Sequence, residues 1–394
     1  METASPASFL DHCGWLRSLH PIAPSCLRAA LCVALIASAV ACAEQPKRPN
    51  AVGLAFASYE DPARPSWTGP GSRPLATVIW YPAAPGTRES EWKVGVFNAG
   101  WTARGAPLAA GDKKLPLVVL SHGTGGGAAT LSWLAEALAS NGYIVAAVNH
   151  HGNTAAEPSY QPQGFILWWE RARDISILID GLLADPRFGT HIDPSRIGAA
   201  GFSLGGYTVL ATVGVRLDYD QWKRFCADKP DDPNCAPPPE ASFSVADIQR
   251  LLDRDDRVKD SVSHSHESFR DARIKAAFAI APVLGPAMTK TSLAEMRVPV
   301  RIIVGSRDDQ APADVNARLI AAAIANAELE VLPDVRHYTF LARCNFFGRI
   351  VARSLCADPD AIDRAEIHRK VGAHALQFFN RKLQGGMGGK EGGK

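Results

Sequence analysis

Short runs of apolar residues, each followed by a segment with helical spacing, constrain the fold of this chain more than any other feature. Residues 115–120 contain no charged side chain, as expected of a strand buried on both faces of a sheet. Further runs that are mostly apolar follow along the chain, at residues 143–148, 196–200, 274–280 and 298–304. Because strands that alternate with helices form a mostly parallel sheet with helices on both faces, the sequence predicts an α/β fold.

The chain is expected to form one large domain, residues 44–383, around this alternation. Two earlier segments, 52–60 and 75–81, are predicted to be strands. Residues 216–272 interrupt the alternation, because they are polar and rich in proline and contain no long apolar run. We interpret this segment as a cap insertion between a helix and the next strand. The glycine-rich residues 384–394 are expected to be a disordered tail.

The amino terminus has the pattern of an export signal. Residues 29–43 carry no charge and follow Arg28, but they are too few for a membrane-spanning helix, which needs about 20 residues. Small residues at positions 41–43 are typical of a cleavage site. The sequence thus predicts a signal peptide over residues 1–43, an exported protein (periplasmic or secreted) and no stable membrane span. Lipid attachment at Cys42 and a buried helix are the less favoured alternatives.

The charge and the cysteines limit the class of protein further. The net charge is +2, from 42 Lys and Arg against 40 Asp and Glu, which argues against a strongly basic nucleic-acid binder. Removing residues 1–43 leaves four cysteines in two close pairs: Cys226 with Cys235, and Cys344 with Cys356. An even number of cysteines in an exported chain predicts disulfides, and local pairing is the simplest of three connectivities. Neither pair has further ligands at metal-binding spacing, so a metal site is disfavoured.

The motif Gly201-Phe-Ser-Leu-Gly205 carries the strongest chemical signal. It follows the predicted strand 196–200 and opens a predicted helix over 204–215. In that context Ser203 would project from a sharp turn at the end of the strand, as a nucleophile must, and the glycines would allow close backbone contact. A glycine-rich turn without chemistry is the simpler alternative.

A second glycine-rich loop, His122-Gly-Thr-Gly-Gly-Gly127, follows the strand 115–120. Its spacing differs from a dinucleotide-binding loop, and no acidic residue ends the next strand. We interpret it as one half of an oxyanion hole. The donors would be the backbone amides of Thr124 and Leu204.

An acid and a histidine are expected to complete the site. Asp308 and Asp309 follow the strand 298–304, at the carboxyl edge of the sheet where open α/β sheets place their sites. His337 lies in a loop after the predicted last strand and is the favoured base. Two more histidines are expected at the same edge as lining of the pocket: His150 and His151.

At this point the chain resembles the α/β-hydrolase superfamily. It resembles more closely the predicted dienelactone hydrolase group of exported bacterial proteins, near the platelet-activating-factor acetylhydrolases. The stretches that carry the resemblance are Ser121-His-Gly-Thr-Gly-Gly126, His151-Gly-Asn-Thr154, Arg173-Asp-Ile-Ser176, Gly201-Phe-Ser-Leu-Gly-Gly206, Pro282-Val-Leu-Gly-Pro286, Gly305-Ser-Arg-Asp308 and His337-Tyr-Thr-Phe340.

This resemblance implies that Asp308, at the fourth position of the G-x-x-D stretch, is the acid of the site. Dienelactone hydrolases proper use a cysteine nucleophile, whereas this chain has Ser203. We interpret Arg173-Asp174 as a structural ion pair and not as part of the catalytic machinery.

The sequence therefore predicts an exported serine hydrolase of carboxylic esters with short or medium acyl chains, since a polar cap would narrow access. Ser203 would attack the acyl carbonyl, His337 would move the proton, and Asp308 would orient the histidine. The expected partner is a small-molecule ester, with no cofactor, metal or nucleic acid. An acyltransferase with the same triad and a non-catalytic envelope binding protein on a hydrolase fold remain as alternatives.

Overall fold

The structure is a computed structural model that describes residues 48–383, apart from 110, 112 and 242. The predicted signal peptide, with its alternative of a lipid anchor at Cys42, lies outside the described residues. The predicted tail, 384–394, lies outside them too.

Within the described residues, ten strands form one sheet in the order β10-β9-β8-β7-β5-β6-β2-β1-β4-β3. Neighbours from β10 to β6 are parallel, and β2 joins β6 in the antiparallel direction. The strands are β1 (Val52–Pro65), β2 (Ser72–Pro82), β3 (Ser90–Val94), β4 (Phe97–Arg104), β5 (Leu115–Ser121), β6 (Ile144–Val148), β7 (Ile192–Phe202), β8 (Ile274–Ile280), β9 (Val300–Gly305) and β10 (Ala327–Leu332).

The apolar runs of the sequence form the centre of this sheet. In β5, Val119 pairs with Ala146 of β6 on one side and with Ala199 of β7 on the other, and all three are completely buried. Parallel pairing brings the carboxyl ends of these strands to one edge of the sheet. The predicted α/β fold class is confirmed.

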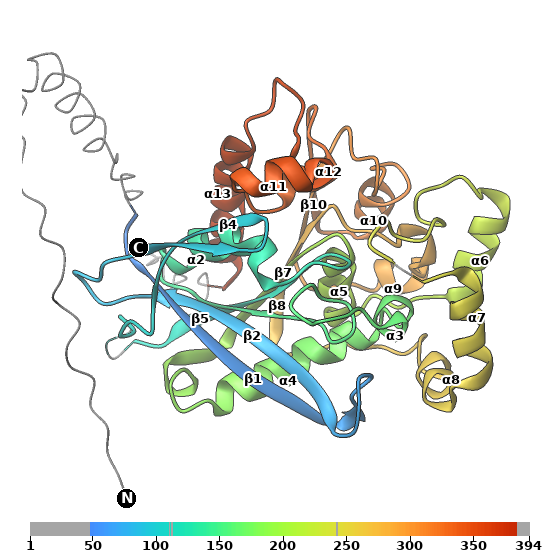
Figure 1. Cartoon of the computed structure of the whole chain (residues 1–394), viewed down its shortest axis with the longest axis horizontal. Coiled ribbons are helices and arrows are strands. Elements are labelled where there is room, and N and C mark those ends of the chain that lie inside the picture. The colour runs from blue at the N-terminus through green and yellow to red at the C-terminus, as the bar shows by residue number, and fades with distance from the viewer. Residues whose placement is uncertain (1–47, 110, 112, 242, 384–394) are drawn as a thin grey trace, which may run out of the picture. The chain divides into compact units, whose positions relative to one another are not determined.

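Helices cover the sheet on both sides, with α13 and α2 on one side and α4 on the other (Figure 1). Phe378 and Phe379 of α13 pack against Phe278 of β8. The helices are α2 (Ser132–Ala139), α3 (Pro162–Ile166), α4 (Glu170–Ala184), α5 (Leu204–Thr212), α6 (Tyr219–Asp228), α7 (Val245–Arg254), α8 (Asp256–Ser263), α9 (Lys290–Ala294), α10 (Ala317–Ala323), α11 (Phe346–Val351), α12 (Arg353–Cys356) and α13 (Arg364–Leu383). Short 3-10 turns are η1 (Ala128–Leu131), η2 (Gly189–His191), η3 (Gly285–Ala287) and η4 (His337–Phe340). None of the helices in the described part of the chain is long and apolar enough to cross a membrane.

The segment 216–272 connects helix α5 to strand β8, and it folds into α6, α7 and α8 (Figure 1). Several hydrogen bonds connect it to the rest of the molecule, including those of Asn234 and Trp169. The side-chain oxygen of Asn234 accepts a hydrogen bond from the Leu284 amide at 3.2 Å. The Trp169 indole donates to the Ser261 hydroxyl of α8 at 3.0 Å.

Both cysteine pairs lie at disulfide bonding distance in the local pairing. The sulfur atoms of Cys226 and Cys235 are 2.00 Å apart, at the end of α6. Those of Cys344 and Cys356 are 1.99 Å apart, on either side of α11 and α12. The second pair therefore closes the segment that directly follows η4.

Candidate active site

Ser203 occupies a sharp turn between β7 and α5. Its backbone has φ +57° and ψ −119°, a conformation that non-glycine residues rarely adopt. The turn is possible because its neighbours lack side chains. A Cβ on Gly205 would lie 1.9 Å from the Ser121 carbonyl oxygen, and one on Gly201 would lie 2.2 Å from the Gly205 carbonyl oxygen.

The structure brings His337 and Asp308 to this serine. The Nε2 atom of His337 lies 3.0 Å from the Ser203 hydroxyl, and its Nδ1 lies 2.8 Å from a carboxylate oxygen of Asp308. All three side chains are buried. They come from three loops at the carboxyl edge of the sheet, after β7, β9 and β10.

The two neighbouring aspartates have different surroundings. The Oδ1 atom of Asp308 accepts hydrogen bonds from the amides of Gln310 and Ala311, at 3.1 and 2.7 Å, which leaves Oδ2 for His337. Asp309 is exposed and pairs with Arg336 at 2.7 Å. The structure therefore places Asp308, and not Asp309, at the position predicted for the acid.

This order of hydrogen bonds defines what the histidine can do. If Nδ1 donates its proton to Asp308, Nε2 is left with a lone pair that can accept the Ser203 proton. A serine hydroxyl, a histidine and a buried carboxylate in this order can perform nucleophilic attack and general acid–base catalysis.

The loop 122–127 lies directly beside the serine. A Cβ placed on Gly123 would lie 3.3 Å from the Cβ of Ser203. Thr124 is the next residue of this loop, and Leu204 is the first residue of α5, so its amide has no partner in the helical ladder. The roles of Thr124 and Leu204 as donors to an oxyanion stay a prediction.

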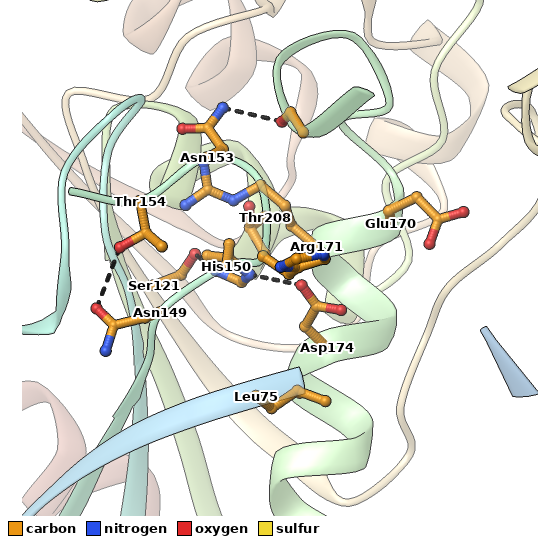
Figure 2. A network of polar contacts seen from close by, with 12 residues as sticks. Leu75, Ser121, Asn149, His150, Asn153, Thr154, Glu170, Arg171, Asp174 and Thr208 are labelled. Atoms are coloured by element: carbon orange, nitrogen blue, oxygen red, sulfur yellow. Dashed lines mark hydrogen bonds and ion pairs between the residues drawn. The ribbon is translucent and has the colours of Figure 1, made fainter. Parts of the chain in front are cut away.

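A buried charge network lies beneath this loop (Figure 2). At its centre, the carboxylate of Asp174 in α4 accepts hydrogen bonds from Arg64 at 2.6 Å and Arg73 at 2.7 Å. These positive charges hold the pKa of Asp174 well below its ordinary value although burial opposes them. The interpretation of an ion pair with Arg173 was wrong, because Arg173 lies on the exposed side of α4.

His150 extends the network to the glycine-rich loop. Its Nδ1 lies 2.9 Å from Asp174, and its Nε2 lies 2.8 Å from the Ser121 hydroxyl (Figure 2). Burial lowers the pKa of His150 to about 3, so its imidazole is neutral. His151 is equally buried and accepts a hydrogen bond from the Trp67 amide at 2.9 Å. Both predicted pocket-lining histidines therefore serve as internal supports.

Arg171 holds the first residue of the loop. Its Nη2 donates to the carbonyl oxygen of His122, and the whole side chain is buried. Burial lowers the pKa of Arg171 to about 9. Burial keeps the pKa of His122 well below its usual value, and the nearby charge of Arg171 lowers it further. Helix α4 thus fixes the loop that lies beside Ser203.

Two family sequence models match parts of this chain. The model of platelet-activating factor acetylhydrolase, isoform II, matches residues 93–164. That of the prolyl oligopeptidase family matches residues 129–230 and includes Ser203.

Three known proteins resemble this chain, two of them in sequence and one in fold. Two cutinases of Thermobifida alba, est1 and est2, are each 31% identical over 103 residues, which is 26% of this chain. The matched region spans only 31% of either cutinase. A ferulic acid esterase from Streptomyces cinnamoneus superposes with a TM-score of 0.58 at 21% identity, over 87% of this chain and 93% of that one. The sheet order, the serine turn and these likenesses agree, and the chain is a member of the α/β-hydrolase superfamily, similar to the platelet-activating-factor acetylhydrolases.

Proposed function

We propose that this protein is a serine hydrolase of carboxylic esters. The observation that carries the proposal is the position of His337 between the Ser203 hydroxyl and the Asp308 carboxylate, at 3.0 and 2.8 Å. In the proposed reaction Ser203 attacks the acyl carbonyl while His337 takes its proton. His337 then protonates the leaving alcohol, and water releases the acyl group from Ser203 by the same route.

The amides of Thr124 and Leu204 stabilise the oxyanion in this proposal, because they flank Ser203 from the loop and from the start of α5. The network of Asp174, His150 and Arg171 supports it by fixing the loop from below. Neither step requires a cofactor.

The proposed substrates are esters of short or medium acyl chains, and the proposed location is outside the cytoplasm. The first point is supported by the insertion 216–272, which contacts Tyr338, the neighbour of His337, through Glu240. The second is supported by the two cysteine pairs at bonding distance, since disulfides form in oxidising compartments. The narrower resemblance to exported dienelactone hydrolases stays a prediction.

The test combines labelling with a substrate panel. A fluorophosphonate probe should modify Ser203 in the wild type and fail with Ser203→Ala, which should lower kcat by roughly 10³–10⁶-fold while remaining folded. The panel contains 4-nitrophenyl esters from acetate to palmitate and a prolyl peptide, because one of the matched families comprises peptidases. Ester turnover that survives in folded Ser203→Ala would contradict the proposal, and turnover of the peptide alone would replace it with amide hydrolysis.

A further inference from the structure

Glu240 is held in place on the insertion between two fixed points. The preceding residues, 237–239, are three consecutive prolines, which restrict the backbone and connect Glu240 to the disulfide at Cys235. On the other side, Phe243 packs edge to face against Phe165, with ring centroids 5.0 Å apart. The position of the Glu240 side chain is therefore defined by the fold of the insertion.

The Glu240 side chain contacts both of the loops that flank the candidate nucleophile. The Tyr338 hydroxyl, one residue after His337, donates a hydrogen bond to its Oε1 at 3.1 Å. On the other side, a Cβ placed on Gly125 would lie 2.8 Å from the Cβ of Glu240. Gly125 follows Thr124, so the Glu240 side chain borders both the histidine loop and the proposed oxyanion loop.

The Glu240 carboxyl forms no ion pair with a basic side chain among the described residues. The structure describes no lysine or arginine nitrogen within 4.0 Å of it. Burial raises the pKa of Glu240, and the nearby His337 partly opposes that rise. A negative charge at this place acts on whatever part of a substrate passes between the two loops.

We propose that Glu240 is a specificity-determining residue that disfavours esters with a negative charge near the scissile bond and favours neutral or cationic ones. The proposal rests on the ester hydrolysis proposed above. Two charges about 7 Å apart at an effective dielectric constant of about 20 change kcat/KM by a factor on the order of 10–100. The selectivity of the wild type between charged and neutral esters should reflect that factor.

The test uses Glu240→Gln and two pairs of substrates of equal shape. The amide oxygen of the new side chain can still accept the Tyr338 hydrogen bond, so this substitution removes the charge and keeps the contact. One pair places an anion in the acyl part, monoethyl succinate against ethyl 4-methylpentanoate. The other places a cation in the alcohol part, acetylcholine against 3,3-dimethylbutyl acetate. Rates are followed by pH-stat titration at pH 8.5, well above the ordinary pKa of a glutamate carboxyl.

We expect Glu240→Gln to change the ratio of kcat/KM for the charged ester to kcat/KM for the neutral ester by about 10–100-fold. The change should occur in the substrate pair whose charge lies near the carboxyl. The ratio should rise for the anionic pair, or fall for the cationic pair. The neutral esters should change little. Glu267→Gln is the matched control, because Glu267 is an exposed carboxylate on the same insertion and its loss changes the net charge equally. Tyr338→Phe removes the hydrogen bond and keeps the charge, so it should leave the ratio unchanged.

Three outcomes with the variants would overturn the inference. Ratios that stay constant for both pairs in Glu240→Gln would show that the carboxyl selects nothing. An equal shift in Glu267→Gln would assign the effect to net charge, and an equal shift in Tyr338→Phe would assign it to the contact that holds the insertion. A wild type that hydrolyses the neutral esters but shows no charge effect contradicts only this inference, whereas one that hydrolyses no ester contradicts the proposed function as well.

Discussion

Replacing Asp308 by asparagine tests the assignment of the acid, and the structure determines which way the new amide must face. The Oδ1 position accepts hydrogen bonds from two backbone amides, those of Gln310 and Ala311. An asparagine must therefore place its oxygen there, which turns its NH₂ group toward Nδ1 of His337. That nitrogen then has to accept a hydrogen bond, so the proton moves to Nε2, where it prevents the imidazole from taking the Ser203 proton.

We expect Asp308→Asn to lower kcat/KM by about 10⁴-fold, which corresponds to about 5 kcal/mol of transition-state stabilisation. Asp309→Asn is the matched control. Its carboxylate forms an exposed pair with Arg336, and such pairs contribute about 0–1 kcal/mol, so the rate should change by less than about fivefold. The assay is hydrolysis of 4-nitrophenyl butyrate, with circular dichroism to establish folding. A folded Asp308→Asn that keeps more than a tenth of the wild-type rate would refute the reasoning. So would an Asp309→Asn whose rate falls further than that of Asp308→Asn.

Three further predictions concern stability. Asp174→Asn should lower the free energy of unfolding in urea by about 3–5 kcal/mol, because it removes the carboxylate that pairs with the buried Arg73, and a loss below about 1 kcal/mol would contradict this. Burial lowers the pKa of His368 from 6.5 to about 3, so only the unfolded chain takes up a proton as the pH falls below 6.5. The wild type should consequently lose about 2 kcal/mol relative to His368→Asn between pH 7 and pH 5, whereas parallel pH curves would count against it. Reduction should remove about 2–3 kcal/mol per disulfide and lower kcat as well, and mass spectrometry of the native protein should find two disulfides and no free thiol.

The parallel half of the sheet could be predicted from the sequence because burial on both faces leaves an unambiguous pattern. The run 115–120, for example, forms nearly all of β5. Strands β3 and β4 were not predicted. Their residues are only partly buried and contain glycine and charged side chains, as in Ser90–Val94, so they have no apolar run to detect.

The candidate site also contains residues that could be predicted from the sequence and residues that could not. Ser203, Asp308 and His337 follow predicted strands, and a strand end has a known place in this kind of sheet, so their meeting could be anticipated. The contacts of the residues that surround and support the site could not be anticipated. Arg64 and Asp174 are separated by 110 residues and meet only through the packing of β1 on α4. Glu240 lies in a polar segment in which no residue stands out. Contacts of this kind depend on tertiary packing and leave no local pattern.

The backbone of Ser203 has a consequence for the evolution of this protein. A φ of +57° costs a residue with a side chain about 1–3 kcal/mol, a penalty that glycine does not carry. Selection for thermal tolerance alone would therefore favour glycine at position 203 and would accumulate inert descendants with higher melting temperatures. Variant libraries of this chain that are screened for thermal stability therefore need a simultaneous selection for catalytic turnover. At position 203, thermal stability favours glycine, whereas catalysis requires serine.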